Sequence, residues 1–241
     1  MKALILAGGR GKRLNELSAN HNKCMTKVGG RPVIEYNLDN AAATNLEEII
    51  IVVGYRAEEI INAYGNRYKG KVIRYVIQWE QKGLVDAVQC AREAVGGQEF
   101  MLMLSDEVLV NPRHRAMIEE FRKGDCLVLC GVLNVEDKDM IRRTYTLIQD
   151  EDRNVFRLVE KPRHPLNDLM GTGVCCFKNE IYNYIDFTPI HHERKEKELP
   201  DLIQCVIDEG KKVKTFHVCE RYTNINSPED ITAAEKLLKQ K

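Results

Sequence analysis

Short apolar runs of strand length alternate with segments of helical period through the first 130 residues of the chain. Several runs, such as Ile49–Val53, are continuous stretches of aliphatic residues, which are typical of strands buried on both faces of a sheet. Strands that alternate with helices build βαβ units around a parallel sheet. The alternation predicts an α/β fold: a single Rossmann-like domain with a mixed, mostly parallel central sheet.

The later part of the chain has a different pattern. From Val128 to Phe177 the strand-like runs follow one another closely, which predicts an inserted antiparallel element. The expected strands are Ala3–Leu6, Ile49–Val53, Val72–Ile77, Phe100–Leu104, Cys126–Val132, Thr146–Gln149, Val155–Glu160, Val174–Phe177 and Val213–Val218. The expected helices are Ile34–Ala43, Arg56–Tyr64, Leu84–Ala94, His114–Arg122, Pro200–Asp208 and Pro228–Leu238. Because no linker rich in Gly, Ser or Pro interrupts them, we expect one domain over residues 1–241.

Composition and charge limit the partners and the compartment. Lys plus Arg and Asp plus Glu number 36 each, so the chain lacks the basic excess of a nucleic-acid-binding protein. No stretch approaches the ~18 apolar residues of a membrane-spanning helix, so we expect no membrane partner. The eight cysteines form no CxxC pair and no zinc-ligand spacing, which indicates buried thiols in a reducing, cytoplasmic setting. Any anion must therefore be met by a local cluster of cations.

The segment from Leu4 to Leu14 joins the first strand to a glycine-rich loop, LILAGGRGKRL. Glycines let a backbone approach a ligand closely and turn its N–H groups inward to form an anion-binding concavity. The first βα loop of an open parallel sheet lies at the carboxyl ends of the strands, where such folds bind ligands. Arg13 and Lys23 add full positive charges. The loop predicts a phosphate site, although it lacks the third small residue of a dinucleotide-binding loop and matches no P-loop.

These residues resemble the signature of the sugar nucleotidyltransferase superfamily, in which L-A-G-G-x-G-x-R-L is followed about ten residues later by a lysine. Here that lysine is Lys23, in the segment NKCMTKVGGRPVI. The chain has Asn22 and Lys27 where relatives commonly have prolines, and Lys27 is a second cation close by. The register with Gly30-Arg31-Pro32 favours Lys23.

The resemblance continues nearly to the end of the chain through short segments in the family's order. They are Gln78 and Gly83 in a base-reading segment, Ser105-Asp106 at a strand end, Glu160-Lys161-Pro162, Gly171-Thr172-Gly173, and the block from Asn224 to Ile231. In relatives the aspartate and the terminal block hold a metal ion. The Glu-Lys-Pro glutamate meets sugar hydroxyls there, and its lysine meets a phosphate.

The resemblance implies transfer of a nucleoside monophosphate from a pyrimidine nucleoside triphosphate to a sugar-1-phosphate, with Mg²⁺ as cofactor and pyrophosphate as product. It implies a nucleotide-binding half over residues 1–125 and a substrate-binding half, with the antiparallel element, over residues 126–241. The implied catalytic residues are Arg13 and Lys23. The implied nucleotide-binding residues are Leu6, Ala7, Gly8, Gly9, Gly11, Gln78, Gly83 and Ser105. The implied substrate-binding residues are Glu160, Lys161, Thr172, Gly173 and Arg194. The implied metal ligands are Asp106 with Asn226 or Asn224.

Two departures keep alternatives open. Both candidates for the second metal ligand are asparagine where many relatives have aspartate, and Thr144-Tyr145-Thr146 places bulk where relatives have a glycine beside the sugar. One alternative is a cytidylyltransferase acting on a phosphorylated alcohol, polyol or phosphonate. Another is a non-catalytic, nucleotide-sensing relative. A third alternative is a metal-dependent glycosyltransferase, but such an enzyme would lack the glycine loop with its paired cations. The oligomeric state is open, with a homodimer as one candidate.

Overall fold

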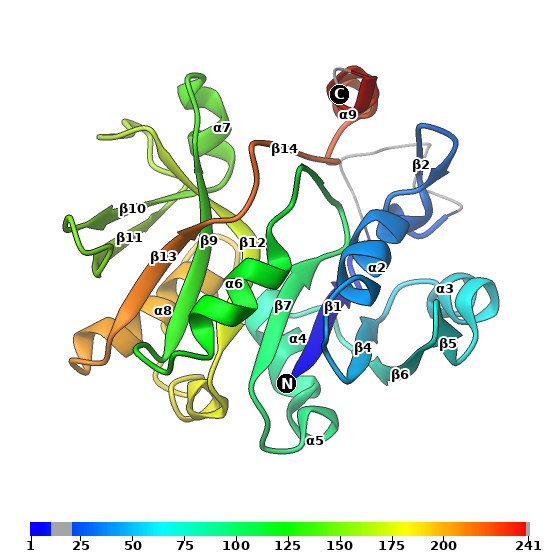
Figure 1. Ribbon diagram of the computed structural model, residues 1–241, viewed down its shortest axis with the longest axis horizontal. Helices are drawn as coiled ribbons and strands as arrows, with labels where there is room; N and C mark the ends of the chain where they lie inside the picture. The colour runs from blue at the N-terminus through cyan, green and yellow to red at the C-terminus, as the bar shows by residue number, and fades with distance from the viewer. Residues whose placement is uncertain (11–20, 240–241) are drawn as a thin grey trace.

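In the computed structural model, which describes residues 1–10 and 21–239, ten strands form one central sheet (Figure 1). Four parallel strands occupy its middle in the order β7 (Phe100–Leu104), β1 (Lys2–Ala7), β4 (Glu48–Val53) and β6 (Lys71–Ile77). The short strand β5 (Arg67–Tyr68) runs antiparallel at one edge. The alternation of strands and helices therefore gives the parallel βαβ arrangement that the sequence predicted.

The later strands add an antiparallel region beside β7. Strand β12 (Leu169–Phe177) pairs antiparallel with β7, with β9 (Val128–Asn134) and with β10 (Tyr145–Gln149). Strand β11 (Val155–Glu160) extends from β10, and β13 (Val213–His217) runs parallel to β9. The sheet divides at β12, where the register shifts between Gly171 and Cys175.

Helices cover both faces of the sheet, because successive side chains of a strand point to opposite faces. On β1, Ala3, Ile5 and Ala7 belong to one core, and Leu4 and Leu6 to the other. The first core is completed by α2 (Ile34–Ala42), α3 (Ala57–Tyr64), α6 (His114–Phe121), α7 (Lys138–Arg143) and α9 (Pro228–Lys239). The second is completed by α4 (Leu84–Cys90), α5 (Arg92–Val95) and α8 (Leu199–Asp208). Helices α2 and α6 lie in front of the sheet in Figure 1.

Several expected boundaries are wrong. The helix expected over Leu84–Ala94 is two helices, because the N–H of Ala91 bonds the carbonyl of Val88 in a tighter turn. The strand expected from Cys126 begins two residues later, at Val128. The strand expected over Val174–Phe177 begins at Leu169, so the segment Gly171-Thr172-Gly173 is part of a buried strand.

The sequence pattern also missed short elements beside the sheet. Strand β8 (Glu107–Val110) pairs antiparallel with β14 (Arg221–Asn224), and Glu107 lies opposite Asn224. Strands β2 (Lys27–Val28) and β3 (Arg31–Pro32) form a hairpin after the 3-10 helix η2 (Lys23–Met25), and a second such helix, η3 (Asn179–Asn183), follows β12. The β8–β14 pair brings the end of β7 against the segment that leads into α9. In Figure 1, β14 and α9 lie at the top of the molecule.

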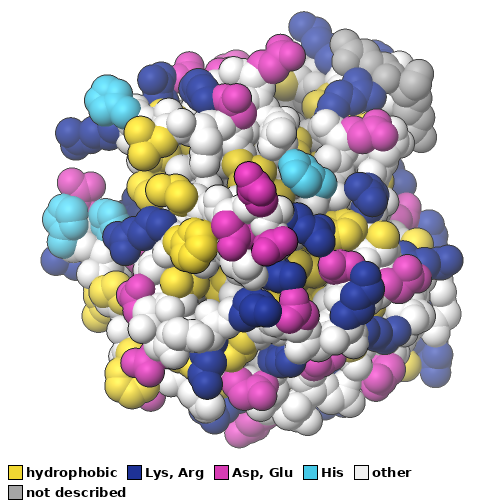
Figure 2. All heavy atoms as spheres, turned by 60° about the vertical axis from the view of Figure 1, so that its left-hand side comes forward, with side chains coloured by type: hydrophobic (Ala, Val, Ile, Leu, Met, Phe, Trp, Pro, Cys, Tyr) yellow, Lys and Arg dark blue, Asp and Glu magenta, His cyan; other side chains and the backbone are white. Residues whose placement is uncertain are grey.

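Charges are mixed over the surface. The face on the left of Figure 1, which includes the antiparallel strands, carries interspersed acidic and basic side chains in its described part (Figure 2). Such a distribution matches the balance of 36 basic and 36 acidic residues. None of the described helices is long and apolar enough to cross a membrane.

Candidate active site

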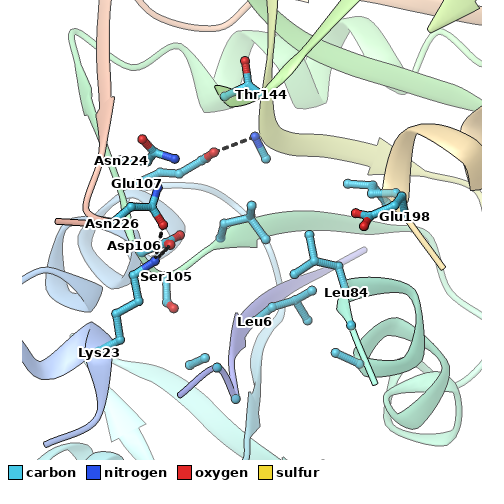
Figure 3. A pocket seen from close by; sticks show the side chains of 18 of the residues that line it. Leu6, Lys23, Leu84, Ser105, Asp106, Glu107, Thr144, Glu198, Asn224 and Asn226 are labelled. Atoms are coloured by element: carbon cyan, nitrogen blue, oxygen red, sulfur yellow. Dashed lines mark hydrogen bonds and ion pairs between the residues drawn. The ribbon is translucent and has the colours of Figure 1, made fainter. Parts of the chain in front are cut away.

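A cavity of about 640 Å³ opens at the carboxyl ends of the parallel strands (Figure 3). Its walls come from the ends of β1 and β7, the start of α4, strand β12 and the end of β11. This volume is in the range of sites that enclose a small-molecule ligand. The location agrees with the rule that open α/β sheets bind ligands beyond the carboxyl ends of their strands.

Three side chains from distant parts of the chain meet at one wall of the cavity. The Nζ of Lys23 forms an ion pair with Asp106 Oδ2 and donates to Asn226 Oδ1 at 2.8 Å, as the dashed lines in Figure 3 show. Asp106 follows β7, and Asn226 follows β14. Lys27, the second cation considered for this position, is exposed on β2. The structure therefore brings Lys23, and not Lys27, to the cavity wall.

Lys23 is held in place by its neighbour Asn22. The Asn22 side chain is buried and donates from Nδ2 to the carbonyls of Tyr55, at 2.6 Å, and Ala7, at 3.3 Å. Its Oδ1 accepts from the backbone N–H of Cys24 at 3.0 Å and so caps η2. A proline could make none of these side-chain bonds. The asparagine therefore anchors the lysine-bearing segment against the glycine loop.

Asn226 is fixed by the first turn of α9. Its backbone N–H and that of Ser227 both donate to Asp230 Oδ2, at 2.8 Å each. The N–H of Ile225 donates to the Asp106 carbonyl at 2.8 Å, which ties the segment to the end of β7. Asn224 also lines the cavity but lies beside Glu107, away from Lys23 (Figure 3).

The start of the glycine loop forms the neighbouring wall of the cavity. Leu6, Ala7, Gly8 and Gly9 line the cavity, and a Cβ on Gly8 would lie 2.9 Å from Gln78 Oε1. Glycine at this position therefore allows a close approach of the loop to β6. Ser105, also in the lining, donates its N–H to the Leu6 carbonyl at 3.2 Å. Gly11 and Arg13 lie outside the described residues.

Gln78 lies at the end of β6 with its side chain buried at 4% exposure. Its Nε2 donates to Asp86 Oδ2 at 2.7 Å and to the Gly83 carbonyl at 3.2 Å. Gly83 has a positive φ of 95°, and a Cβ there would approach Glu196 to 3.0 Å. Both predicted base-reading residues thus line the cavity next to the loop, in a backbone arrangement that favours glycine at position 83.

A charged cluster forms the far end of the cavity. Glu160 Oε1 lies 2.7 Å from Lys161 Nζ and 3.6 Å from Arg194 Nη2, and Arg194 also pairs with Glu198. Burial raises the pKa of Glu160, and the nearby Lys161 partly opposes that shift. The backbone N–H of Lys161 donates to the Thr144 carbonyl at 2.7 Å, which joins the start of β10 to the end of β11.

Comparison with known proteins places this arrangement in a family. The model of the family described as nucleotidyl transferase matches residues 2–239. The chain belongs to the nucleotidyl transferase family. It is 29% identical, over all of its length and 97% of the relative, to the UTP–glucose-1-phosphate uridylyltransferase AglF of Haloferax volcanii. A glucose-1-phosphate thymidylyltransferase of Streptomyces griseus is 30% identical, over 99% of the chain and 66% of the relative.

The fold is shared with solved structures at lower identity. A UTP-bound UGPase from Acinetobacter baumannii superposes with a TM-score of 0.84 at 20% identity, covering 98% of this chain and 92% of that one. The curated relatives differ in length: the chain spans about two thirds of the S. griseus enzyme and 55% of a bifunctional GlmU protein of Methanocaldococcus jannaschii.

In this nucleotidyl transferase, two predicted substrate-binding residues do not reach the cavity. Thr172 is buried, and its hydroxyl donates to the Gly131 carbonyl at 2.9 Å, so it links β12 to β9. Arg194 does not line the cavity but forms ion pairs with Glu160 and Glu198, which do. Gly173, by contrast, lines the cavity, where a Cβ would lie 2.3 Å from Leu104.

The bulky residue expected to reshape the sugar pocket is accommodated by a neighbouring glycine. The Tyr145 side chain is buried, and its hydroxyl donates to the Thr172 carbonyl at 2.9 Å. A Cβ on Gly171 would lie 2.1 Å from the Tyr145 ring. The ring therefore occupies the space that any larger residue at position 171 would need.

Sequence reasoning missed Glu107, the residue after Asp106. Its Oε1 accepts from Gly173 N–H at 2.8 Å and from the Tyr222 hydroxyl at 2.7 Å, whereas Oε2 is buried without a hydrogen-bond partner. Burial, reinforced by the nearby Asp106 charge, raises the pKa of Glu107 to about 8. The only trace of this residue in the sequence is an acid directly after the metal-ligand candidate.

Arg143 was also missed, because it ends a six-residue helix that the sequence pattern did not predict. It lines the cavity, and its Nη1 lies 3.8 Å from Asp230 Oδ1. The other oxygen of Asp230 accepts from the backbone N–H of Asn226.

Proposed function

We propose that this nucleotidyl transferase moves a nucleoside monophosphate from a pyrimidine nucleoside triphosphate to a sugar-1-phosphate and releases pyrophosphate. The observation that carries the proposal is the meeting of Lys23, Asp106 and Asn226 between two different walls. The glycine loop and Gln78 form one wall, and Glu160 and Lys161 form the other. A cation and two oxygen ligands thus lie between a candidate nucleotide site and a candidate sugar-phosphate site.

The relatives support this choice of substrates. The H. volcanii relative is a UTP–glucose-1-phosphate uridylyltransferase, and the S. griseus relative is a glucose-1-phosphate thymidylyltransferase. Both names pair a pyrimidine nucleotide with a sugar-1-phosphate. The match over residues 2–239 covers both walls of the cavity. We therefore propose the same pair of substrate classes for this chain.

The reaction needs positioning and charge stabilisation more than proton transfer. An oxygen of the sugar phosphate attacks the α-phosphorus, and the bond from that phosphorus to the bridging oxygen of the β-phosphate breaks. The departing pyrophosphate keeps the electron pair. Because the attacking phosphate is ionised at neutral pH, no general base is required. Catalysis then depends on holding two polyanions together and stabilising the charge that develops between them.

We propose that Lys23 supplies that stabilisation. Its Nζ is shared between Asp106 and Asn226 and lies in the wall between the two candidate sites. When an α-phosphate enters, the ammonium can exchange the amide oxygen of Asn226 for a phosphate oxygen while it keeps Asp106 as a neighbour. A lysine is a compact charge with three donors, which suits such an exchange.

The donor set around Lys23 fits Mg²⁺. Among the described residues no three His, Cys, Asp or Glu side chains are grouped to hold a metal ion by themselves. Mg²⁺ takes oxygen ligands and usually binds one or two protein groups together with phosphates and waters. The Asp106 carboxylate and the Asn226 amide oxygen, which converge on one ammonium, are two such ligands. Bound there, Mg²⁺ would offset negative charge on the triphosphate.

The charges of the cavity indicate why a further cation is needed. Its described lining contains five acidic side chains, Asp106, Glu107, Glu160, Glu196 and Glu198, and four basic side chains, Arg10, Lys23, Arg143 and Lys161. Glu107, whose pKa is raised to about 8, is mostly neutral at pH 7, so the acidic and basic groups are close to balance. These described groups bring no excess of positive charge to a triphosphate and a sugar phosphate. Mg²⁺ and the exchange of existing ion pairs would together meet that charge.

On the acceptor side, we propose that Lys161 binds the incoming phosphate and that Glu160 accepts hydrogen bonds from sugar hydroxyls. Arg194 would act on the substrate indirectly, because it contacts Glu160 and Glu198 and does not line the cavity. Gly173 would contribute its backbone to the sugar site, because an added Cβ there would collide with Leu104 and Glu107.

The test is pyrophosphate release in a matrix of substrates. CTP, UTP, dTTP, GTP and ATP are each paired with sugar-1-phosphates and with phosphorylated alcohols, with Mg²⁺ and with a chelator. We expect release only with Mg²⁺, with a pyrimidine nucleotide and with a sugar-1-phosphate. Release with a phosphorylated alcohol and no sugar phosphate would contradict the proposed acceptor class. Triphosphate binding without release from any pair would support a nucleotide sensor instead.

A further inference from the structure

The direction of the Gln78 side-chain amide is fixed by its surroundings. Its nitrogen lies 2.7 Å from Asp86 Oδ2 and 3.2 Å from the Gly83 carbonyl. A carboxylate and a carbonyl are both pure acceptors, so the atom between them must be the donor, Nε2. A flipped amide would place its oxygen against two other oxygens. The orientation therefore follows from the chemistry of the partners and not from a choice between two similar atoms.

This orientation decides what Gln78 can offer to a ligand. An amide nitrogen has two protons, and the two acceptors account for both of them. The oxygen lies on the other side, beside Gly8, whose added Cβ would be 2.9 Å from Oε1. Gly8 and Gln78 both line the cavity. Gln78 thus presents an acceptor, and no donor, toward the glycine loop.

Pyrimidine bases differ at the position such an acceptor would read. Uracil and thymine carry an N–H at N3 between two carbonyls, whereas cytosine carries an unprotonated N3 next to an amino group. An acceptor aimed at N3 bonds uracil or thymine and meets the lone pair of cytosine in the same pose. A glutamine free to turn over could serve both kinds of base, but a fixed one cannot.

We infer that Asp86 is a positioning residue that locks the Gln78 amide and thereby makes the site prefer uracil or thymine nucleotides over cytosine nucleotides. The inference rests on the proposed function in taking this part of the cavity as the base site. Asp86 itself lies in the first turn of α4 and is absent from the cavity lining. It acts on the base only through Gln78.

The experiment compares the binding of UTP and CTP by titration calorimetry, without acceptor. We expect the wild-type protein to bind UTP at least about tenfold more tightly than CTP, the value of one well-formed hydrogen bond. The Asp86→Asn variant can offer Gln78 either an amide oxygen or an amide nitrogen, so only the longer contact with the Gly83 carbonyl still opposes a flipped amide. Its UTP-to-CTP affinity ratio should fall about tenfold, with tighter CTP binding as the distinctive change.

Two controls separate positioning from a general effect. Glu93→Gln removes an exposed carboxylate from the neighbouring helix α5 and should leave the ratio unchanged. In a Gln78→Ala background, Asp86→Asn should no longer change the ratio, because the group through which it acts is gone. If Asp86→Asn does not fold, Asp86→Ser offers a hydroxyl that can donate or accept and tests the same point.

Three results would overturn the inference: a wild-type protein that binds CTP as tightly as UTP, a folded Asp86 variant with the wild-type ratio, or a Glu93→Gln variant with the same shift. Because binding requires no turnover, failure of the proposed function is a separate observation. A protein with the expected base preference and no pyrophosphate release would retain the positioning role of Asp86 and refute the transferase reaction.

Discussion

The two ends of the cavity hold their side chains in different ways. At the Gln78 end, a buried neutral amide is held between two acceptors, Asp86 and the Gly83 carbonyl. At the Glu160 end, charged side chains hold one another: Glu160 pairs with Lys161 and Arg194, and Arg194 pairs with Glu198. One end is set by hydrogen-bond direction, and the other is a balance of charges.

The difference indicates what each end can do. A locked amide can discriminate between ligands of similar size, because a wrong partner leaves a buried polar group unpaired. Paired charges can change partners, so an incoming phosphate can replace a carboxylate at Lys161. Lys23 lies between the two ends and is itself paired. Substitutions should therefore alter the choice of base at one end, acceptor affinity at the other, and turnover in between.

The largest effect is expected at Lys23. Lys23→Ala should lower kcat by about 10²–10³, as expected when one preorganised electrostatic stabiliser is removed. The matched control is Lys27→Ala, which removes an exposed lysine four residues away and should leave kcat unchanged. Steady-state pyrophosphate release measures both. Near-normal turnover in Lys23→Ala, or an equal loss in Lys27→Ala, would refute the role of Lys23.

The next effect is expected at the charged end. Glu160→Gln should raise KM for the sugar phosphate by about 10–100-fold, because a charge-assisted hydrogen bond to a hydroxyl is lost. The UTP-to-CTP preference should not move. A change in base preference with an unchanged acceptor KM would contradict the division between the two ends.

Glu160 also predicts a pH dependence. Burial raises the pKa of Glu160, so its carboxylate is protonated at a higher pH than an exposed glutamate. The ionised form is the stronger acceptor, so KM for the sugar phosphate should rise as the pH falls through that raised pKa. Glu160→Gln should lack this rise. A KM profile that is the same in both proteins would assign the titration to another group.

A smaller effect distinguishes the two asparagines. Asn226→Ala should raise the Mg²⁺ concentration needed for half-maximal activity about tenfold, since it removes one of two oxygen ligands. Asn224→Ala, whose side chain lies beside Glu107, should change that concentration little. Titration of activity with Mg²⁺ measures both variants. The opposite order would make Asn224 the second ligand.

An effect of the same size is expected at the neutral end. Gln78→Ala should reduce the UTP-to-CTP ratio of kcat/KM about tenfold and leave KM for the sugar phosphate unchanged. Competition between the two nucleotides in one reaction measures the ratio directly. A ratio that stays at the wild-type value would mean that Gln78 does not read the base.

Much of the fold follows from the sequence because strand and helix periods differ. The parallel strands β1, β4, β6 and β7 are apolar runs of the right length, and their ends are correct to within one residue. Short elements were missed because a strand of two or four residues is too short to show a hydrophobic repeat. The β8–β14 pair is one of them, and it determines where Asp106 meets the Asn226 segment.

The candidate site was predictable where a family motif places a residue, and less so where a side-chain direction decides. Lys23 and Asn226 are 203 residues apart in the sequence. Only the family resemblance predicted that both belong to one site. Thr172 was predicted to bind substrate from its motif alone, whereas in strand β12 its side chain is buried and its hydroxyl bonds a neighbouring strand. The role of Asp86 depends on which end of an amide faces it, which no sequence pattern records.

The central claim is that the α-phosphorus is transferred while the β- and γ-phosphates leave together. The most direct test uses UTP radiolabelled at the α-phosphorus or at the γ-phosphorus, with glucose-1-phosphate and Mg²⁺. We predict that the α-label appears only in the sugar nucleotide and the γ-label only in pyrophosphate. A γ-label in inorganic phosphate, or an α-label that stays in a free nucleotide, would contradict the account.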